Sequence, residues 1–365
     1  MRILFICDGL GGGGKERRFV QLVKGLNDNG YGELHLLMTR DELAYRELES
    51  YDIKTTYLLR SQSGFFRKFC RYIYALKPDL VQTWEFVPMF YFSMISPFLP
   101  FKCSYSLSTA ADCNFHLWPY YKQVIHRWSC LLADTVVGNS LAGLENYRVP
   151  VSKRRCIYNG FDMARLQRDL DKDIRKELNI KTKYVVSMIA RFSPGKDWPL
   201  FLHSAFKLLK KRNDVTFLAV GEGSSRRDVE KLIPAEYKNQ ILFLGRRADI
   251  EIIFRGTDIS VLCTNPEMHS EGVSNSILES CAFGVPVIAT RGGGTAEIIQ
   301  EGRCGFIVEP HDVEELSDRI DYLLNNLELR RNMGKESREM VTSRFSLDRA
   351  TRQYIELFDN AICDE

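Results

Sequence analysis

Short apolar segments alternate with amphipathic segments along the whole chain. In the second half, six apolar runs predict strands, at residues 184–189, 215–220, 241–243, 259–262, 285–289 and 305–308. Helical patterns lie between these runs. Continuous apolar strands that alternate with helices are typical of a parallel sheet covered on both faces. The second half is therefore predicted to be a Rossmann-like α/β domain.

The first half repeats this pattern, with strands predicted at residues 3–7, 34–38, 80–82 and 135–137. A highly charged segment, 167–183, separates the two sets of strands. We therefore predict an N-terminal domain of residues 1–165 and a C-terminal domain of residues 166–345. Apolar side chains recur at positions 347, 350, 354, 357 and 361, a spacing that predicts a final helix within residues 346–365.

The composition is that of an ordinary globular protein, with 45% hydrophobic residues, 27% charged residues and a net charge of +3. So small a positive charge argues against a nucleic-acid partner. Ten cysteines without a CxxC pair favour reduced thiols over a disulfide scaffold or a zinc site. The apolar start of the chain is too short for a signal peptide, so we expect a cytoplasmic protein.

The strongest chemical signal is a pair of glutamates, Glu271 and Glu279, around a glycine-containing loop. Ser274 is a plausible N-cap for the helix that holds Glu279. The loop can direct backbone N–H groups and the positive end of a helix toward a diphosphate. A carboxylate can accept two hydrogen bonds side by side, which suits the neighbouring hydroxyls of a sugar. The alternative is that both glutamates are solvated surface residues.

Two cations, Arg191 and Lys196, follow the strand at residues 184–189 and precede a helix. The departure of a nucleoside diphosphate builds up negative charge, which an arginine and a lysine can stabilise without a metal ion. The alternative is a pair of solvated cations on a loop. We interpret both residues as ligands of the diphosphate.

The run Gly9–Gly14 satisfies the pattern G-x-G-x-x-G between a strand and a helix, which by itself indicates a dinucleotide site. A run made almost entirely of glycine matches many patterns, so the indication is weak. The expected ribose-binding acid is also unclear, because Thr39 and Arg40 precede Asp41 after the second strand. A tight turn between strand and helix is the third interpretation.

Several of these motifs occur in a fixed order between residues 155 and 310. They are Asn159-Gly-Phe-Asp162, Ala190-Arg-Phe192 with Lys196-Asp197, Val220-Gly-Glu-Gly223, Glu271 to Glu279, and Gly284 to Thr290 with Gly293 and Glu297. In this order they resemble the motifs of the retaining GT-B glycosyltransferases, specifically glycosyltransferase family four. The resemblance extends over almost the whole chain.

The resemblance implies the GT-B fold, in which two Rossmann-like domains face each other across a cleft and the last helix crosses back to the first domain. It implies that Glu271 contacts a donor-sugar hydroxyl, that Glu279 binds the ribose, and that no metal or other cofactor takes part. The remaining donor-binding residues that it implies are Gly12, Gly13, Gly14, Arg191, Lys196, Gly223, Arg246, Gly272, Val273, Ser274 and Asn275.

Members of this family often carry a histidine in the first domain, near the reacting carbon of the sugar. The corresponding stretch of this chain holds Ser108 or Thr109 at that position, and Asp112 or His116 are the nearest replacements. We select His116 as a candidate catalytic residue, together with Glu271, Arg191 and Lys196. The alternative is that His116 is an ordinary packed or exposed residue.

Residues 60–77 contain five cations, no acid and an aromatic stripe, which suits either contact with anionic lipid or a core helix with a solvated basic face. A second basic cluster at residues 148–155 and the aromatic stretch 118–128 favour an acceptor at a membrane. We therefore expect transfer of a hexose or N-acetylhexosamine from a nucleotide sugar to a glycan or lipid-linked glycan. This reaction would serve cell-surface polysaccharide or lipopolysaccharide synthesis.

Two alternatives come from other classes of protein. One is a catalytically silent GT-B protein that only binds a nucleotide sugar, and the other is a nicotinamide-dependent oxidoreductase. A glycosidase that uses Glu271 and Glu279 is less favoured, because hydrolysis does not need the phosphate-binding features beside them.

Overall fold

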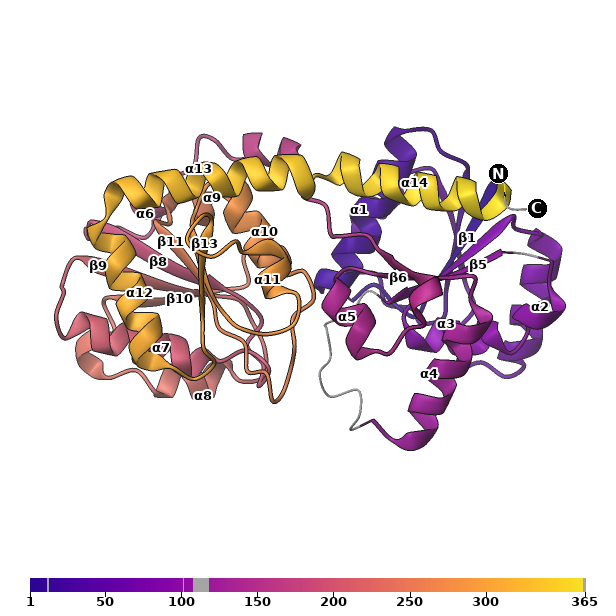
Figure 1. Ribbon diagram of the computed structural model, residues 1–365, viewed down its shortest axis with the longest axis horizontal. Coiled ribbons are helices and arrows are strands. Elements are labelled where there is room, and N and C mark those ends of the chain that lie inside the picture. The colour runs from indigo at the N-terminus through magenta and orange to yellow at the C-terminus, as the bar shows by residue number, and fades with distance from the viewer. Residues whose placement is uncertain (12, 101, 108–117, 364–365) are drawn as a thin grey trace. The chain divides into compact units, whose positions relative to one another are not determined.

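The computed structural model describes residues 1–11, 13–100, 102–107 and 118–363. The chain divides into two compact units. Unit 1 comprises Met1–Gly160 and Leu347–Glu365, and unit 2 comprises Phe161–Ser346. Each unit is a parallel sheet with helices on both faces (Figure 1).

Unit 2 contains a six-stranded parallel sheet in the order β10-β9-β8-β11-β12-β13. Its strands are β8 (Tyr184–Ile189), β9 (Val215–Val220), β10 (Ile241–Gly245), β11 (Ile259–Leu262), β12 (Val287–Thr290) and β13 (Gly305–Val308). The central strands are mostly apolar because helices bury both of their faces. For this reason the sequence pattern predicted them closely.

The helices of unit 2 are α6 (Ile174–Glu177), α7 (Trp198–Leu209), α8 (Arg226–Lys231), α9 (Ile250–Gly256), α10 (Asn275–Ala282), α11 (Thr295–Ile298), α12 (Val313–Asn325) and α13 (Leu327–Arg344). Side chains of α7 and α12 pack with alternate residues of β8 on one face of the sheet. Side chains of α6 and α9 pack with Val185 and Leu218 on the other. Short 3-10 turns η5 (Met163–Gln167) and η6 (Ala235–Tyr237) complete the unit.

Unit 1 contains a seven-stranded parallel sheet in the order β3-β2-β1-β4-β5-β6-β7. Its strands are β1 (Arg2–Cys7), β2 (Glu33–Met38), β3 (Ile53–Tyr57), β4 (Leu80–Trp84), β5 (Lys102–Leu107), β6 (Thr135–Gly138) and β7 (Arg154–Cys156). Its helices are α1 (Gly14–Asp28), α2 (Phe65–Leu76), α3 (Phe86–Ser93), α4 (Tyr120–Leu132), α5 (Leu141–Asn146) and α14 (Leu347–Cys363), with 3-10 turns η1 (Arg46–Ser50), η2 (Ser96–Phe98) and η4 (Val151–Lys153).

The C-terminal helix α14 packs within unit 1, where it lies beside α1 (Figure 1). Arg18 Nη2 donates to the Tyr354 hydroxyl at 2.6 Å, and Tyr31 donates to Asp359 at 2.5 Å. A side chain at Gly25 would overlap that of Thr351, so the two helices depend on this glycine to approach closely. These contacts explain why a segment at the end of the chain belongs to the first unit.

The boundary between the units lies at residues 160 and 161, five residues before the predicted position of 165 and 166. The amide of Phe161 donates to the Phe345 carbonyl at 2.7 Å. Arg165 is buried among side chains of unit 2. The charged segment 167–183 therefore lies inside unit 2 and does not divide the two domains.

The aromatic stripe predicted within residues 60–77 belongs to the core of unit 1. Phe65, Phe69 and Ile73 of α2 are buried, whereas the cations of the helix lie on its exposed face. This is the second of the two interpretations of that segment. No described helix is long and apolar enough to span a membrane. The eight cysteines whose side chains are described are free thiols.

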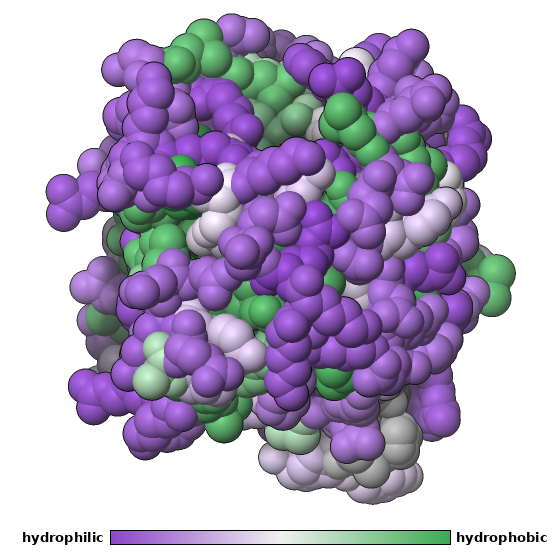
Figure 2. All heavy atoms as spheres, turned by 90° about the vertical axis from the view of Figure 1, so that its left-hand side faces the viewer, coloured by the Kyte–Doolittle hydropathy of each residue, from purple (hydrophilic) through white to green (hydrophobic). Residues whose placement is uncertain are grey.

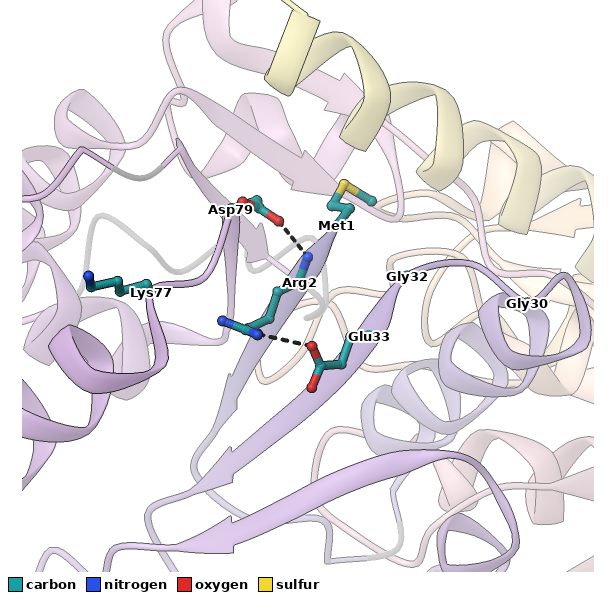
Figure 3. A pocket seen from close by; sticks show the side chains of 7 residues that line it. All are labelled: Met1, Arg2, Gly30, Gly32, Glu33, Lys77 and Asp79. Carbon is teal, nitrogen blue, oxygen red and sulfur yellow. Dashed lines mark hydrogen bonds and ion pairs between the residues drawn. The ribbon is translucent and has the colours of Figure 1, made fainter.

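A polar hollow lies at the amino ends of the first two strands of unit 1, lined by Met1, Arg2, Gly30, Gly32, Glu33, Lys77 and Asp79 (Figure 3). Arg2 Nε binds Glu33 at 3.1 Å, and the Arg2 amide binds Asp79 at 2.6 Å. Ligands of open α/β sheets bind at the opposite, carboxyl ends of the strands. Because it lies at the opposite end of the strands and Arg2, Glu33 and Asp79 are bound within it, we interpret this hollow as a structural feature of the sheet.

Candidate donor site in unit 2

The sheet of unit 2 changes direction between β8 and β11. From β8 the chain builds outward through β9 and β10, and from β11 it builds the other way through β12 and β13. Loops that leave neighbouring strands in opposite directions open a crevice at such a switch point. The loops after β8 and β11 contain most of the residues that the sequence selects.

The loop after β8 is fixed by two aromatic side chains. Phe192 and Trp198 are fully buried and stack with their ring centroids 3.9 Å apart. The Trp198 indole donates to the Arg191 carbonyl at 3.2 Å, so the backbone of Arg191 is held while its side chain is exposed. That side chain makes no hydrogen bond or ion pair with any residue the structure describes, which leaves its charge available for a ligand.

The loops after β8 and β11 run side by side in opposite directions. Asp197 donates its amide to Cys263, and Asn265 donates its amide to Gly195, at 3.0 and 3.1 Å. An isolated antiparallel bridge pairs Lys196 with Thr264 between them. This pairing brings two residues that are 75 positions apart in the sequence, Lys196 and Glu271, into a close ion pair.

Glu271 is held through one of its two carboxylate oxygens. Oε1 contacts the Lys196 ammonium, accepts from the Thr264 hydroxyl at 3.1 Å and lies 3.7 Å from His269 Nε2. Oε2 has no hydrogen-bond partner among the described residues, although only 12% of the side chain is exposed. The carboxylate is therefore fixed in place with one oxygen left to accept from a ligand.

Burial lowers the pKa of the Lys196 ammonium to about 7. The Glu271 carboxylate beside it acts in the opposite direction, because a neighbouring negative charge favours the protonated form. A bound diphosphate would act in the same way as the carboxylate. The charge of Lys196 is therefore sensitive to what occupies the crevice.

The backbone of Glu271 is fixed by the loop after β12. The Gly294 amide donates to the Glu271 carbonyl at 2.7 Å. Gly293 has a φ of +50°, and a Cβ at this position would overlap the same carbonyl. Only glycine combines this conformation with so close an approach. The Gly293 that the sequence motif includes therefore positions Glu271.

A second glycine, Gly223, allows the loops after β8 and β9 to approach each other closely. Gly223 has a φ of +155°, and a Cβ there would overlap the Phe192 carbonyl. Phe192 donates its amide to the Glu222 carbonyl at 3.0 Å. The Val220–Gly223 motif therefore fixes the backbone on which Arg191 is mounted. Its direct contact with the donor remains a prediction.

Helix α10 begins at the same edge of the sheet. Ser274 occupies its N-cap position, although its side chain makes no capping hydrogen bond. Ser276 Oγ donates to the Ile189 carbonyl at 2.9 Å, which ties the first turn to the end of β8. The first amides of a helix lack partners within it and carry partial positive charge. This end of α10 can accept an anion beside Glu271.

Glu279 lies in a buried network that the sequence analysis did not find. Arg165 donates to Glu279 at 2.8 Å through Nη1 and to Glu251 at 2.8 Å through Nε, and all three residues are at most 4% exposed. A buried carboxylate requires such a partner. Glu279 therefore has a structural role in addition to its predicted contact with the ribose. Arg165 was missed because no spacing links it to residues 251 and 279.

The other predicted residues differ in their placement. Arg246 is exposed just after β10, and Gly272, Val273 and Asn275 lie in the segment that leads into α10. Two predicted residues, Gly12 and His116, lie outside the described residues, as do the alternatives Ser108, Thr109 and Asp112. Thr264 and His269 contact Glu271 but were not selected from the sequence, because neither belongs to a motif.

Residues 170–340 match the family model described as glycosyl transferases group 1. This segment contains Arg191, Lys196, Glu271 and the start of α10. Unit 2 is a group 1 glycosyltransferase domain. The chain is 29% identical over 235 residues to N-acetyl-alpha-D-glucosaminyl L-malate synthase of Bacillus anthracis, an alignment that covers 63% of this chain and 60% of that protein.

A second curated relative is the lipopolysaccharide 1,2-N-acetylglucosaminetransferase of Salmonella typhimurium, 25% identical over 58% of both chains. The chain thus spans less than two thirds of the length of these curated relatives. Among solved structures, HepE of Anabaena in complex with UDP superposes with a TM-score of 0.84 and 22% identity, over 99% of this chain and 100% of that chain. The predicted GT-B fold with two Rossmann-like domains is confirmed.

The glycine loop of unit 1 differs from the donor site of the glycosyltransferase domain. Side chains added at Gly11 and Gly13 would meet the carboxylates of Glu42 and Glu16. Asp8, just before the loop, binds Arg60 at 2.9 Å and Arg40 at 3.2 Å. Carboxylates beside the loop disfavour a pyrophosphate there. The predicted roles of Gly13 and Gly14 in donor binding stay predictions.

Another residue missed from the sequence, Glu85, follows β4 directly, whereas the predicted strand ended at residue 82. It is a non-glycine residue with φ +76° and ψ 175°, a strained conformation that costs about 1–3 kcal/mol. Its carboxylate lies 2.5 Å from the Lys15 ammonium, and burial raises its pKa. The rule that functional residues follow strands would have selected Glu85, since it comes immediately after Trp84.

Among the described residues, no three histidine, cysteine, aspartate or glutamate side chains are grouped so that they could hold a metal ion.

Proposed function

We propose that this chain is a glycosyltransferase that moves a hexose or N-acetylhexosamine from a nucleotide-sugar donor to a glycan or lipid-linked glycan. The reaction serves cell-surface polysaccharide synthesis at the cytoplasmic side of the membrane. The observation that carries the proposal is the Lys196–Glu271 pair at the switch point of unit 2. The match of residues 170–340 and the names of the two relatives support the reaction type.

The donor diphosphate would bind Lys196, Arg191 and the first amides of α10. Transfer breaks the bond between the anomeric carbon and the diphosphate oxygen, so negative charge grows on the departing group. Fixed cations and helix amides that face this oxygen lower the barrier. Because these groups supply the positive charge, the proposed reaction needs no metal ion and no other cofactor.

The donor sugar would lie against Glu271, whose Oε2 is free to accept a hydrogen bond from a sugar hydroxyl. Thr264 and Lys196 hold the other oxygen, so little conformational freedom is lost when the sugar binds. The acceptor oxygen then bonds to the anomeric carbon on the face that the diphosphate leaves. Its proton passes to a phosphate oxygen of the donor, and the configuration at the anomeric carbon is retained.

The acceptor would use unit 1, where Glu85 and Glu16 share Lys15. Carboxylates accept hydrogen bonds from hydroxyl groups, the most frequent groups of a glycan. The backbone strain at Glu85 supports this assignment, because residues with strained backbone angles are concentrated at functional sites.

A panel of nucleotide sugars tests the proposal. A donor that binds the folded protein should raise its unfolding temperature, and UDP-sugars are the first choice because the HepE structure holds UDP. Release of nucleoside diphosphate with a glycan acceptor should follow, should persist in EDTA, and should give a product whose anomeric proton coupling matches the donor. Donor binding without release under any acceptor would favour the catalytically silent alternative.

The nicotinamide-dependent alternative has less support, because Glu42 and Glu16 lie beside the loop that would hold the pyrophosphate. Titration with NAD and NADP tests it directly. Binding of either dinucleotide, abolished by Gly11→Val, would replace the glycosyltransferase proposal for unit 1.

A further inference from the structure

Helix α4 of unit 1 has an unusual surface. Its exposed apolar and aromatic side chains are Tyr120 (80% exposed), Tyr121 (61%), Val124 (43%), Trp128 (58%) and Leu131 (61%). Residues 120, 124, 128 and 131 follow one stripe of the helix, whereas His126, Ser129 and Cys130 on the other side are buried. We call these five exposed side chains the α4 face. Figure 1 shows α4 on the outside of unit 1.

Single exposed apolar residues are common on soluble proteins, but a contiguous group is not. Figure 2 shows the ordinary situation, a surface where polar side chains predominate and apolar ones are scattered.

The charges around the α4 face are mainly positive. The helix itself contains Lys122 and Arg127, both exposed, and no acid. Lys153 donates to the carbonyls of Leu131 and Ala133 at the end of α4, which brings the basic segment 148–155 beside it. That segment contains Arg148, Arg154 and Arg155. The acids nearby are Asp134, which accepts from the Cys103 amide, and Glu145, which lies 3.9 Å from Arg154.

The residue types fit a lipid surface better than a protein partner. Tyrosine and tryptophan concentrate at the boundary between lipid headgroups and acyl chains, because each combines an apolar ring with a polar group. Lysine and arginine beside them attract anionic headgroups, at about 1 kcal/mol for each cation near the surface. Amphipathic helices with this combination lie in the plane of the interface.

We infer that the α4 face docks this chain on an anionic membrane, with Tyr120, Tyr121 and Trp128 in the headgroup layer. The inference deepens the proposed function, since a lipid-linked acceptor is held at the same surface. Docking would confine the enzyme to the plane in which its acceptor diffuses. It needs no spanning helix.

Binding of the full chain to vesicles tests this inference. Vesicles of phosphatidylcholine and phosphatidylglycerol, at about seven to three, should carry the protein in flotation experiments, and vesicles of phosphatidylcholine alone should carry much less. The triple variant Tyr120→Ser, Tyr121→Ser, Trp128→Ser should lose about tenfold or more of this binding. A matched control, Leu170→Ser with Leu327→Ser, removes two exposed apolar side chains from unit 2 and should bind as the unchanged protein does.

A second variant tests the electrostatic contribution to membrane binding separately from the insertion of aromatic side chains. Lys122→Glu with Arg127→Glu should weaken binding to the anionic vesicles and leave the small binding to neutral ones unchanged. Absence of vesicle binding at low salt, or equal binding by the triple variant, would overturn the inference. A change from dimer to monomer in the triple variant, without vesicle binding, would instead assign the α4 face to contact between copies of the chain and would also overturn it.

The test is independent of the proposed reaction. The triple variant should release nucleoside diphosphate at an unchanged rate with a water-soluble glycan acceptor, because α4 carries none of the proposed donor ligands. If the protein bound vesicles but transferred no sugar, the membrane-docking inference would be supported and only the proposed enzymatic activity would be contradicted.

Discussion

In unit 1 the sheet changes direction between β1 and β4, and in unit 2 it changes direction between β8 and β11. Unit 1 places Asp8, Glu16 and Glu85 at this edge, each bound to a cation. Unit 2 places there an ion pair whose carboxylate has a free oxygen, together with an exposed arginine. Because the first six strands of each unit follow the same order, the chemistry depends on the side chains that each crevice receives.

The difference teaches which half of the reaction suits each unit. A diphosphate needs positive charge and N–H donors, which the edge of unit 2 offers at Arg191, Lys196 and the start of α10. A hydroxyl-rich acceptor needs hydrogen-bond acceptors, which the carboxylates of unit 1 supply. The dinucleotide-like glycine run of unit 1 is therefore a weaker guide than the charges beside it.

The largest expected effect concerns the stability of unit 2. Arg165→Met should lower the free energy of unfolding by about 3–5 kcal/mol, because it leaves Glu251 and Glu279 as buried charges without their partner. Lys15→Met in unit 1 removes the cation of an ion pair that is 39% exposed on the lysine side and should cost about 1 kcal/mol or less. Urea unfolding measures both. Equal losses of unfolding free energy in the two variants would contradict the predicted difference between the two networks.

The next effect concerns donor chemistry. Lys196→Met should reduce kcat/KM for diphosphate release by about 10²–10³-fold, the usual cost of removing one group that stabilises developing negative charge. Lys15→Met should leave donor affinity unchanged, as measured by calorimetric titration with the nucleoside diphosphate. If Lys15→Met weakened donor binding and Lys196→Met left diphosphate release unchanged, the donor would bind to unit 1 instead.

A smaller effect tests the acceptor side. Glu85→Gly relieves a positive φ and should raise the free energy of unfolding by about 1 kcal/mol. The same change should lower kcat/KM for the acceptor about tenfold, because a hydroxyl-binding carboxylate is lost. Glu85→Gln keeps the strained backbone and serves as the control. A Glu85→Gly variant that is more stable and fully active would show that the strain serves no function.

The pH dependence of donor binding should show the smallest effect. The Lys196 pKa of about 7 in the free protein means that the ammonium is charged below pH 7, and a bound diphosphate raises this pKa. Donor affinity should therefore be full below pH 7 and fall above it, by at most about tenfold per pH unit until the pKa of the complex is reached. Lys196→Arg, which stays charged, should remove this dependence. A profile unaltered by Lys196→Arg would exclude Lys196 as its source.

The sequence predicted the strands of unit 2 better than those of unit 1. Strands β8, β9, β11 and β13 agree residue for residue, because strands buried on both faces are mostly apolar. Strands β3, β5 and β7 of unit 1 were missed. Polar or charged residues in all three interrupt the apolar run that marks a buried strand, and β3 and β7 also lie at the two edges of the sheet.

The site was predictable where residues belong to loops with a fixed order of motifs. Lys196 and Glu271 were selected separately, and the structure brings them into contact. What the sequence did not provide was the network behind them. Arg165 and Glu251 act on Glu279 through tertiary packing, which leaves no mark on spacing or composition. Glu85 was missed because the predicted strand ended at residue 82, before the true end of β4 at Trp84.

The most direct test compares two titrations of the Glu271→Gln variant, one with the nucleoside diphosphate and one with the matching nucleotide sugar. The account predicts normal affinity for the diphosphate at pH 6, where Lys196 is charged, because Lys196, Arg191 and α10 remain. It also predicts loss of the additional affinity that the sugar provides in the unchanged protein. Equal weakening of both ligands, or of neither, would contradict the assignment of the sugar to Glu271.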